Sequence, residues 1–269
     1  LVMMLVGLPL MLNGFMQIKE RVPPSPEKVT MRDTFHNLRQ NKPLFIVLLS
    51  FFFCVFHNVA NGIYIYFFIY NMGDGSLQMA IGVMGIVAAV VCLIAPMLTR
   101  RMQKRKLFMI LCGLDVAVRV VMWFAGYQHT VLLFTLLGLS TLFVMMTNIL
   151  TSSMIADTIE YAEYHTHKRC AAITFSGQTF TGKMSVAVGG GLIGVFLTMI
   201  GYVPQAQTQS DSVLSGLFFG ICLLPAIGSL IRMGFMSRFT FTEEKHAEIC
   251  RLLEMRRFHQ RNSAAARVS

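Results

Sequence analysis

Four ionisable side chains other than histidine lie inside long apolar runs: Asp115, Arg119, Lys183 and Arg232. A side chain that stays charged at the centre of a bilayer costs about 2.5–3.5 kcal/mol on insertion scales, so each one needs a partner, water or an interface. Asp115 and Arg119 are four residues apart and can pair within one helix, which favours a structural ion pair. Arg232 falls in the last turns of its run, and we expect it to reach the cytoplasmic interface as an anchor.

Lys183 is the most informative of these residues because its run begins near Ile173. At about 1.5 Å per residue its Cα lies roughly 15 Å deep, close to the midplane. Thr179 and Ser176 share its helix face, and Gln178 lies beside them. This polar stripe predicts the wall of a water-filled cavity. A structural pair between Lys183 and a carboxylate is the alternative, and the two can coexist.

Other polar side chains interrupt two further apolar runs. Asn58 and Asn61 share a helix face, and they either line the same cavity or hydrogen-bond between helices. The neighbouring His57 could relay protons, although a packed, hydrogen-bonded histidine is the more common case. Asn148 lies about 12 Å from the cytoplasmic end of its run, near the depth of Lys183, so we expect the two in one site.

The apolar residues that surround these groups are gathered into runs. They make up 55% of 269 residues, charged residues make up 13%, and the mean hydropathy is +0.60. Soluble domains carry roughly 25% charged residues, so the composition indicates an all-α membrane protein. Each run is long enough to cross a hydrocarbon core about 30 Å thick. We expect six complete spans, at residues 44–70, 77–99, 107–127, 131–156, 173–202 and 213–236.

The order of apolar and polar segments predicts the domain organisation. Residues 1–16 resemble the end of an earlier span, the sixth of a twelve-helix transporter, and 17–43 form a cytoplasmic central loop with a Pro-Pro-Ser-Pro run. Residues 44–236 then form the six-helix bundle of helices seven to twelve, followed by a cytoplasmic tail at 237–269. The chain therefore reads as the C-terminal half of such a protein, with a missing N-terminal half as its partner.

Positive charge predicts the orientation of the spans. All Lys and Arg residues except Arg119, Lys183 and Arg232 lie in the loops on one side or in the tail, and the alternate loops contain none. Positive loops stay cytoplasmic, so we expect a multi-pass protein of the plasma membrane with a cytoplasmic C-terminus. The net charge of +10 is explained by this topology and by the lipid bilayer, and no nucleic-acid partner is needed.

An acidic cluster precedes a basic one at the cytoplasmic end of the fourth span. Asp157, Glu160 and Glu163 follow helical spacing, so we expect the span to continue into the cytoplasm as a helix. Together with Arg169 these charges could lock a cytoplasmic gate, and an ordinary solvated loop is the alternative. A metal site on the nearby histidines and cysteine is disfavoured because basic residues crowd it.

Three long motifs resemble the glycoside–pentoside–hexuronide:cation symporter family, especially its melibiose-permease-like members. They are ADTIEYAEYHTHKRC at 156–170, SGQTFTGK at 176–183 and IGYVP at 200–204, and YIYFFIYNMGD at 64–74 also fits. The similarity covers nearly the whole chain. It implies a major-facilitator fold and uptake of a sugar or glycoside together with Na⁺ or H⁺ at a bacterial inner membrane.

The resemblance also implies roles for residues at matching positions. Lys183 matches a lysine that serves sugar and cation coupling, and Gln178 and Thr179 match positions at the sugar site. Asp157, Glu160 and Arg169 match charges of the cytoplasmic gate. Two positions depart from the melibiose-permease-like pattern, since Asn148 replaces a sugar-stacking tryptophan and Ala171 replaces a glutamate. The loss of the aromatic platform suggests a more polar or anionic sugar. The predicted substrate-binding set is Lys183, Thr179, Gln178, Asn148, Asn58 and Asn61.

The expected function is cation-coupled sugar symport by alternating access. The alternatives are a major-facilitator carrier of a drug or lipid and a structural membrane subunit without transport. An enzyme is not expected because no nucleophile–base pair or metal cluster lies at matched depth. No cofactor is expected, and the ligands of the coupling Na⁺ or H⁺ are expected in the missing N-terminal half.

Overall fold

A computed structural model describes residues 2–17, 41–166 and 171–268, and every regular element in these ranges is helical. The chain divides into two units, residues 1–30 and 31–269. In the first unit, helix α1 (Val2–Gln17) carries the apolar run expected there. Most of the central loop falls outside the described residues.

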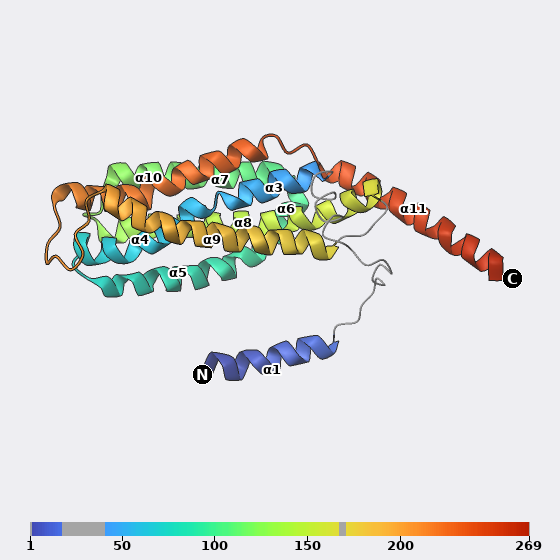
Figure 1. Ribbon diagram of the computed structural model, residues 1–269, viewed down its shortest axis with the longest axis horizontal. Coiled ribbons are helices and arrows are strands. Elements are labelled where there is room, and N and C mark those ends of the chain that lie inside the picture. The colour runs from blue at the N-terminus through green and yellow to red at the C-terminus, as the bar shows by residue number, and fades with distance from the viewer. Residues whose placement is uncertain (1, 18–40, 167–170, 269) are drawn as a thin grey trace. The chain divides into compact units, whose positions relative to one another are not determined.

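The second unit contains six helical segments that are long and apolar enough to cross a membrane, as expected from the sequence. Its long helices run side by side in one bundle (Figure 1). The spans are, in order, α3 (Lys42–Phe52) with α4 (Val55–Asn71); η1 (Gly75–Leu77), α5 (Gln78–Val91), η2 (Cys92–Ile94) and α6 (Ala95–Arg101); α7 (Lys104–Ala125); α8 (Thr130–Thr166); α9 (Ala171–Met199); and α10 (Asp211–Met236).

The span boundaries follow local chemistry. Asn41 caps α3 by accepting a hydrogen bond from the Leu44 N–H at 3.1 Å, and α7 ends where Gly126 adopts a φ of 70°. The fifth span ends at Met199, before the predicted residue 202, because Gly201 turns the chain with a φ of 77°. The fourth span continues to Thr166, so the expected helical extension beyond residue 156 is confirmed.

Helix α10 lies at the centre of the packing, against α7 and α4. Two buried clusters form the core, one around Phe108 and Ile155 and one around Phe67 and Leu217. Close helix contacts depend on small residues. A Cβ at Gly228 of α10 would lie only 2.7 Å from the Cβ of Phe56.

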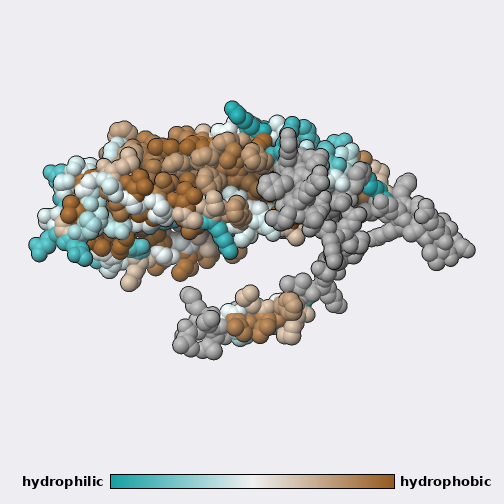
Figure 2. Space-filling model, in the orientation of Figure 1, coloured by the Kyte–Doolittle hydropathy of each residue, from teal (hydrophilic) through white to brown (hydrophobic). Residues whose placement is uncertain are grey.

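The surface of the bundle shows how it meets a bilayer. Hydrophobic residues cover its middle and hydrophilic residues gather at its ends (Figure 2). The outer face of α5 is especially apolar, with Val83, Ile86 and Val90 all exposed. The tail helix α11 (Glu243–Val268) starts near the end of the bundle where α8 ends (Figure 1), and its Ile249 and Leu253 are buried.

Candidate functional site

Helix α9 presents Lys183 on an exposed face, away from the bundle. Ser185 and Gly189 of the same helix are buried against its neighbours, about 160° and 120° around the helix from Lys183. Ser176 and Thr179 are exposed on the Lys183 side. The Lys183 ammonium forms no hydrogen bond or ion pair with the residues that the structure describes. The carboxylate pair considered from the sequence is therefore not formed within this part of the chain.

The exposed surface of α9 has two different sides. Large apolar side chains, including Phe180, Met184 and Val195, lie on one of them. The other carries Ser176, Thr179 and Lys183 in the N-terminal half of the helix, and we refer to these three residues as the polar stripe. The polar stripe is narrow, because Phe175 and Val186 on its opposite flank are also exposed and apolar.

Two of the predicted substrate-binding residues tie helices together at the level of the polar stripe. The Gln178 amide donates to the Ser152 hydroxyl of α8 at 2.7 Å, and the Asn58 amide of α4 donates to the Ser185 hydroxyl at 3.0 Å. Asn58 therefore makes the interhelical hydrogen bond that was one of its two expected roles. Asn61, one turn further along α4, is exposed and has no side-chain partner among the described residues.

Asn148 lies where α8 meets the junction of α3 and α4. Its Oδ1 accepts from the Cys54 thiol at 3.5 Å and from Nη2 of Arg232 at 3.4 Å. The expectation that Arg232 is an interfacial anchor is wrong, since its side chain is 0% exposed and its guanidinium lies 5.2 Å from the ring centre of Phe108. Its position on the buried face of α10 directs the side chain into the bundle.

A buried polar network joins four spans on the other side of α4. Asp115 accepts from Nε of Arg119 at 3.0 Å, from Ser140 at 2.5 Å and from Ser229 at 2.6 Å, and Nε2 of His57 lies 3.3 Å away. Nη1 of Arg119 also donates to the Ile221 carbonyl at 2.8 Å. The arrangement holds α4, α7, α8 and α10 together, and all of its side chains are buried.

Sequence reasoning missed Ser140 and Ser229 as members of this network. Single hydroxyls in apolar spans carry little information, because they can instead donate to a carbonyl of their own helix. The only sequence signal for further members was the Asp115–Arg119 pair, because a carboxylate can accept more hydrogen bonds than one arginine donates.

The glycines of α9 fall into two groups. A Cβ at Gly182 or Gly189 would meet Phe51 at 3.3 Å or Asn58 at 3.0 Å, so close packing explains these positions. A Cβ at Gly190, Gly191 or Gly194 would meet nothing within 4 Å. Gly190 and Gly194 extend the line of the polar stripe toward the opposite end of α9.

The predicted gate residues lie in the C-terminal extension of α8. Nζ of Lys104 donates to Asp157 at 2.5 Å, and Glu160 lies 3.6 Å from Nε2 of His246 in the tail helix. Glu163 is half-buried in the same extension, and Arg169 lies outside the described residues. These contacts attach the extension to the basic loop and to the tail within this chain.

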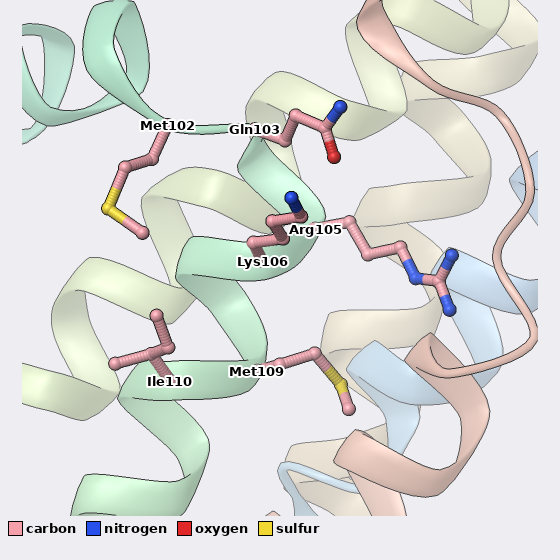
Figure 3. Close-up of a pocket in the computed structure, with 6 residues that line it drawn as sticks. All are labelled: Met102, Gln103, Arg105, Lys106, Met109 and Ile110. Carbon is pink, nitrogen blue, oxygen red and sulfur yellow. The ribbon is translucent and has the colours of Figure 1, made fainter.

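A pocket of about 460 Å³ opens at the short basic loop, away from the polar stripe. Figure 3 shows its lining residues, which come from the loop and the first turns of α7. They are Met102, Gln103, Arg105, Lys106, Met109 and Ile110. None of the predicted substrate-binding residues belongs to this set.

Comparison with known proteins gives a family match over most of the chain. Residues 1–243 match the family described as MFS/sugar transport protein. The chain is 28% identical to YnaJ, an uncharacterised symporter of Bacillus subtilis, over 94% of this chain and 55% of the relative. It is 26% identical to an isoprimeverose transporter of Lactiplantibacillus pentosus, over 85% and 48%. It is 30% identical to a candidate sulfoquinovose importer of Salmonella typhimurium, over 87% and 52%.

These matches confirm the family resemblance and the all-α multi-pass architecture expected from the sequence. The names of the relatives describe transporters and symporters and not enzymes, in agreement with the expected class. The chain spans about half the length of each of these relatives.

Proposed function

This chain belongs to the family of MFS/sugar transport proteins, and we propose that it forms one side of the substrate cavity of a cation-coupled sugar or glycoside symporter. The observation that carries this proposal is the exposed Lys183, which has no partner among the described residues and lies near the middle of a membrane-spanning helix. A permanently lipid-facing ammonium at that depth is disfavoured by about 2.5–3.5 kcal/mol or more.

The position of Lys183 within the polar stripe favours a water-filled cavity over lipid. Ser176 and Thr179 extend the polar surface by two turns, and exposed apolar side chains of α9 flank it. Relatives are about twice as long as this chain, and a second half could face the stripe across a central cavity. Substrate sites of secondary transporters lie at such an interface near the midplane.

The side chains around this face suit an anionic or strongly polar sugar. Lys183 offers a positive charge, and Asn148 offers a small amide in place of an aromatic platform. One relative is described as a candidate importer of sulfoquinovose, a sugar with a sulfonate group. A sulfonate or carboxylate oxygen beside Lys183 would make a charge-assisted hydrogen bond.

The proposed mechanism is alternating access around this cavity. The bundle rocks as a unit against the N-terminal half, so that the polar stripe meets the outer and then the inner solution. Asp157 and Glu160 lie at the inner end of α8 and form part of the cytoplasmic gate. The ligands of Na⁺ or H⁺ are supplied by the N-terminal half.

The test is a transport assay with the full-length protein in membrane vesicles. We expect uptake of labelled sulfoquinovose or glucuronate to exceed uptake of glucose, and to depend on an imposed Na⁺ or H⁺ gradient. The Lys183→Met variant should lose most uptake of the anionic sugars, and Lys183→Arg should retain part of it because the charge remains. Preference for neutral sugars in the wild type would refute the anionic substrate.

The same assay separates the alternatives. A structural membrane subunit would show no uptake in the wild type and would tolerate Lys183→Met. A drug or lipid carrier would move apolar dyes or lipids but not sugars, and sugar competition would leave that transport unchanged.

A further inference from the structure

Arg232 of α10 is a buried cation without a carboxylate partner among the described residues. Its side chain is 0% exposed, and its Nε and Nη1 have no hydrogen-bond partner in that part of the chain. The Ser50 hydroxyl donates to its backbone carbonyl at 3.3 Å, which fixes α10 against α3 but leaves the guanidinium unsatisfied. The guanidinium therefore exerts an uncompensated positive field on its few polar neighbours.

Among the described residues, the only side-chain acceptor that this guanidinium reaches is Oδ1 of Asn148, at 3.4 Å from Nη2. The Cys54 thiol donates to the same oxygen at 3.5 Å. Because guanidinium groups only donate, rotating the Asn148 amide by 180° would place its NH₂ group against the N–H groups of Arg232. The chemistry of the neighbours thus determines which end of this amide faces the interior of the bundle.

The opposite end of the amide is left available. Nδ2 of Asn148 forms no hydrogen bond with the described residues, and the Asn148 side chain is only half-buried. One turn along the same face of α8, the Ser152 hydroxyl meets Gln178 of α9. The free N–H groups of Asn148 therefore lie on the part of α8 that adjoins the helix of the polar stripe.

We propose that Arg232 is a positioning residue that holds the Asn148 amide with its NH₂ group toward the substrate and strengthens it as a donor. This role rests on the proposed function and adds a specificity element to it. The oriented amide recognises an acceptor oxygen, such as one of a sulfonate, a carboxylate or a hydroxyl group. A buried cation that polarises an intervening amide makes its N–H groups stronger donors without entering the cavity itself.

The first test measures the contact itself and needs no substrate. In purified full-length protein, Asn148→Asp places a carboxylate beside the unsatisfied guanidinium, so we expect a higher melting temperature than in the wild type. In the background of Arg232→Met, the same Asn148→Asp change should lower the melting temperature. If Asn148→Asp changes the melting temperature equally in both backgrounds, the proposed contact between Arg232 and Asn148 is refuted.

The second test measures the role in recognition. In vesicle uptake of sulfoquinovose, Arg232→Met should raise KM about tenfold with kcat within about twofold, because one oriented hydrogen bond is lost. Arg232→Lys should restore part of the affinity. In the background of Asn148→Ala, the Arg232→Met change should raise KM no further. Ser50→Ala is the matched control, since it removes a contact to the same residue's backbone and should leave KM unchanged.

The outcomes separate this inference from the function on which it rests. A wild type that takes up no sugar overturns both. The positioning role alone is overturned if the wild type takes up sugar normally but the effects of Arg232→Met and Asn148→Ala on KM are additive. It is also overturned if Arg232→Met changes kcat and not KM. In both cases the proposed function still stands.

Discussion

Asp115 makes the bundle dependent on one buried carboxylate. Its two oxygens accept from Arg119, Ser140 and Ser229 and lie beside His57, and the Asp115 side chain is 2% exposed. We predict that Asp115→Asn lowers the free energy of unfolding by about 3–5 kcal/mol, because it leaves the Arg119 cation buried without its counter-charge. An amide nitrogen in place of one oxygen would also face at least one hydroxyl donor, which adds to the loss.

The measurement is reversible unfolding of the full-length protein in mixed micelles, followed by circular dichroism as the denaturing detergent increases. The predicted loss corresponds to a drop of about two to three and a half orders of magnitude in the folding equilibrium constant. Ser140→Ala is the matched control. It removes one of the donors and keeps both charges, so it should cost only about 1 kcal/mol.

A double-mutant cycle tests the cause of the loss. Combining Asp115→Asn with Arg119→Met removes the uncompensated cation, so the double variant should be more stable than the sum of the two single losses predicts. Additive losses, or a single Asp115→Asn cost below about 1 kcal/mol, would refute the reasoning that the pair is a tightly coupled unit of the bundle.

Three further predictions concern other parts of the chain. Gly228→Ala should lower the free energy of unfolding by about 1–3 kcal/mol in the same assay, because its Cβ would lie 2.7 Å from the Cβ of Phe56. Gly234→Ala on the same helix is the control, since its Cβ meets nothing within 4 Å and should leave stability unchanged or raise it. Equal effects of the two changes would contradict the packing at Gly228. Asp157→Asn removes the ion pair with Lys104, so the basic loop should be less firmly attached and proteolysis after Arg105 should be faster. The charge exchange Asp157→Lys with Lys104→Asp should restore protection from proteolysis. Tyr202 lies outside the spans, where burial and then the hydrogen bond with Tyr70 raise its pKa to about 12. The folded state favours the neutral Tyr202 phenol, so its contribution to stability is fully present below pH 10 and is lost as the pH rises toward 12. Tyr70→Phe removes the hydrogen bond and should shift the absorbance titration of Tyr202 to lower pH.

The sequence predicted the six spans well because each is a long apolar run that ends at charged or turn-forming residues. It did not predict the interruption of the first span at Phe53 and Cys54, where neither proline nor glycine is present. That break places the Cys54 thiol beside Asn148, a tertiary consequence with no local sequence signal.

Arg232 shows why the site was only partly predictable. Its depth along α10 follows from the sequence, but the direction of its side chain depends on which helices pack around α10. The structure turns it toward Phe108 and Asn148, where a cation–π contact and an amide oxygen take the place of the interface. For Lys183 the helical periodicity was sufficient to predict that Ser176 and Thr179 share its face, since a regular helix fixes which residues lie on one side.

Under the proposed function, the polar groups of this chain divide by location as expected for a bundle that moves as one body. Asp115, Arg119 and His57 lie between helices of the bundle, and their contacts with one another hold the helices in register. Lys183 and Asn61 lie on its exposed faces and have no side-chain partners among the described residues. An element that rocks must keep its internal contacts while it exchanges its external ones, and a group that is unpaired within the bundle is free to bind substrate in one state and release it in the other. Under the proposed function, a substitution that gave Lys183 a permanent partner inside this half would therefore impair transport even if it stabilised the fold.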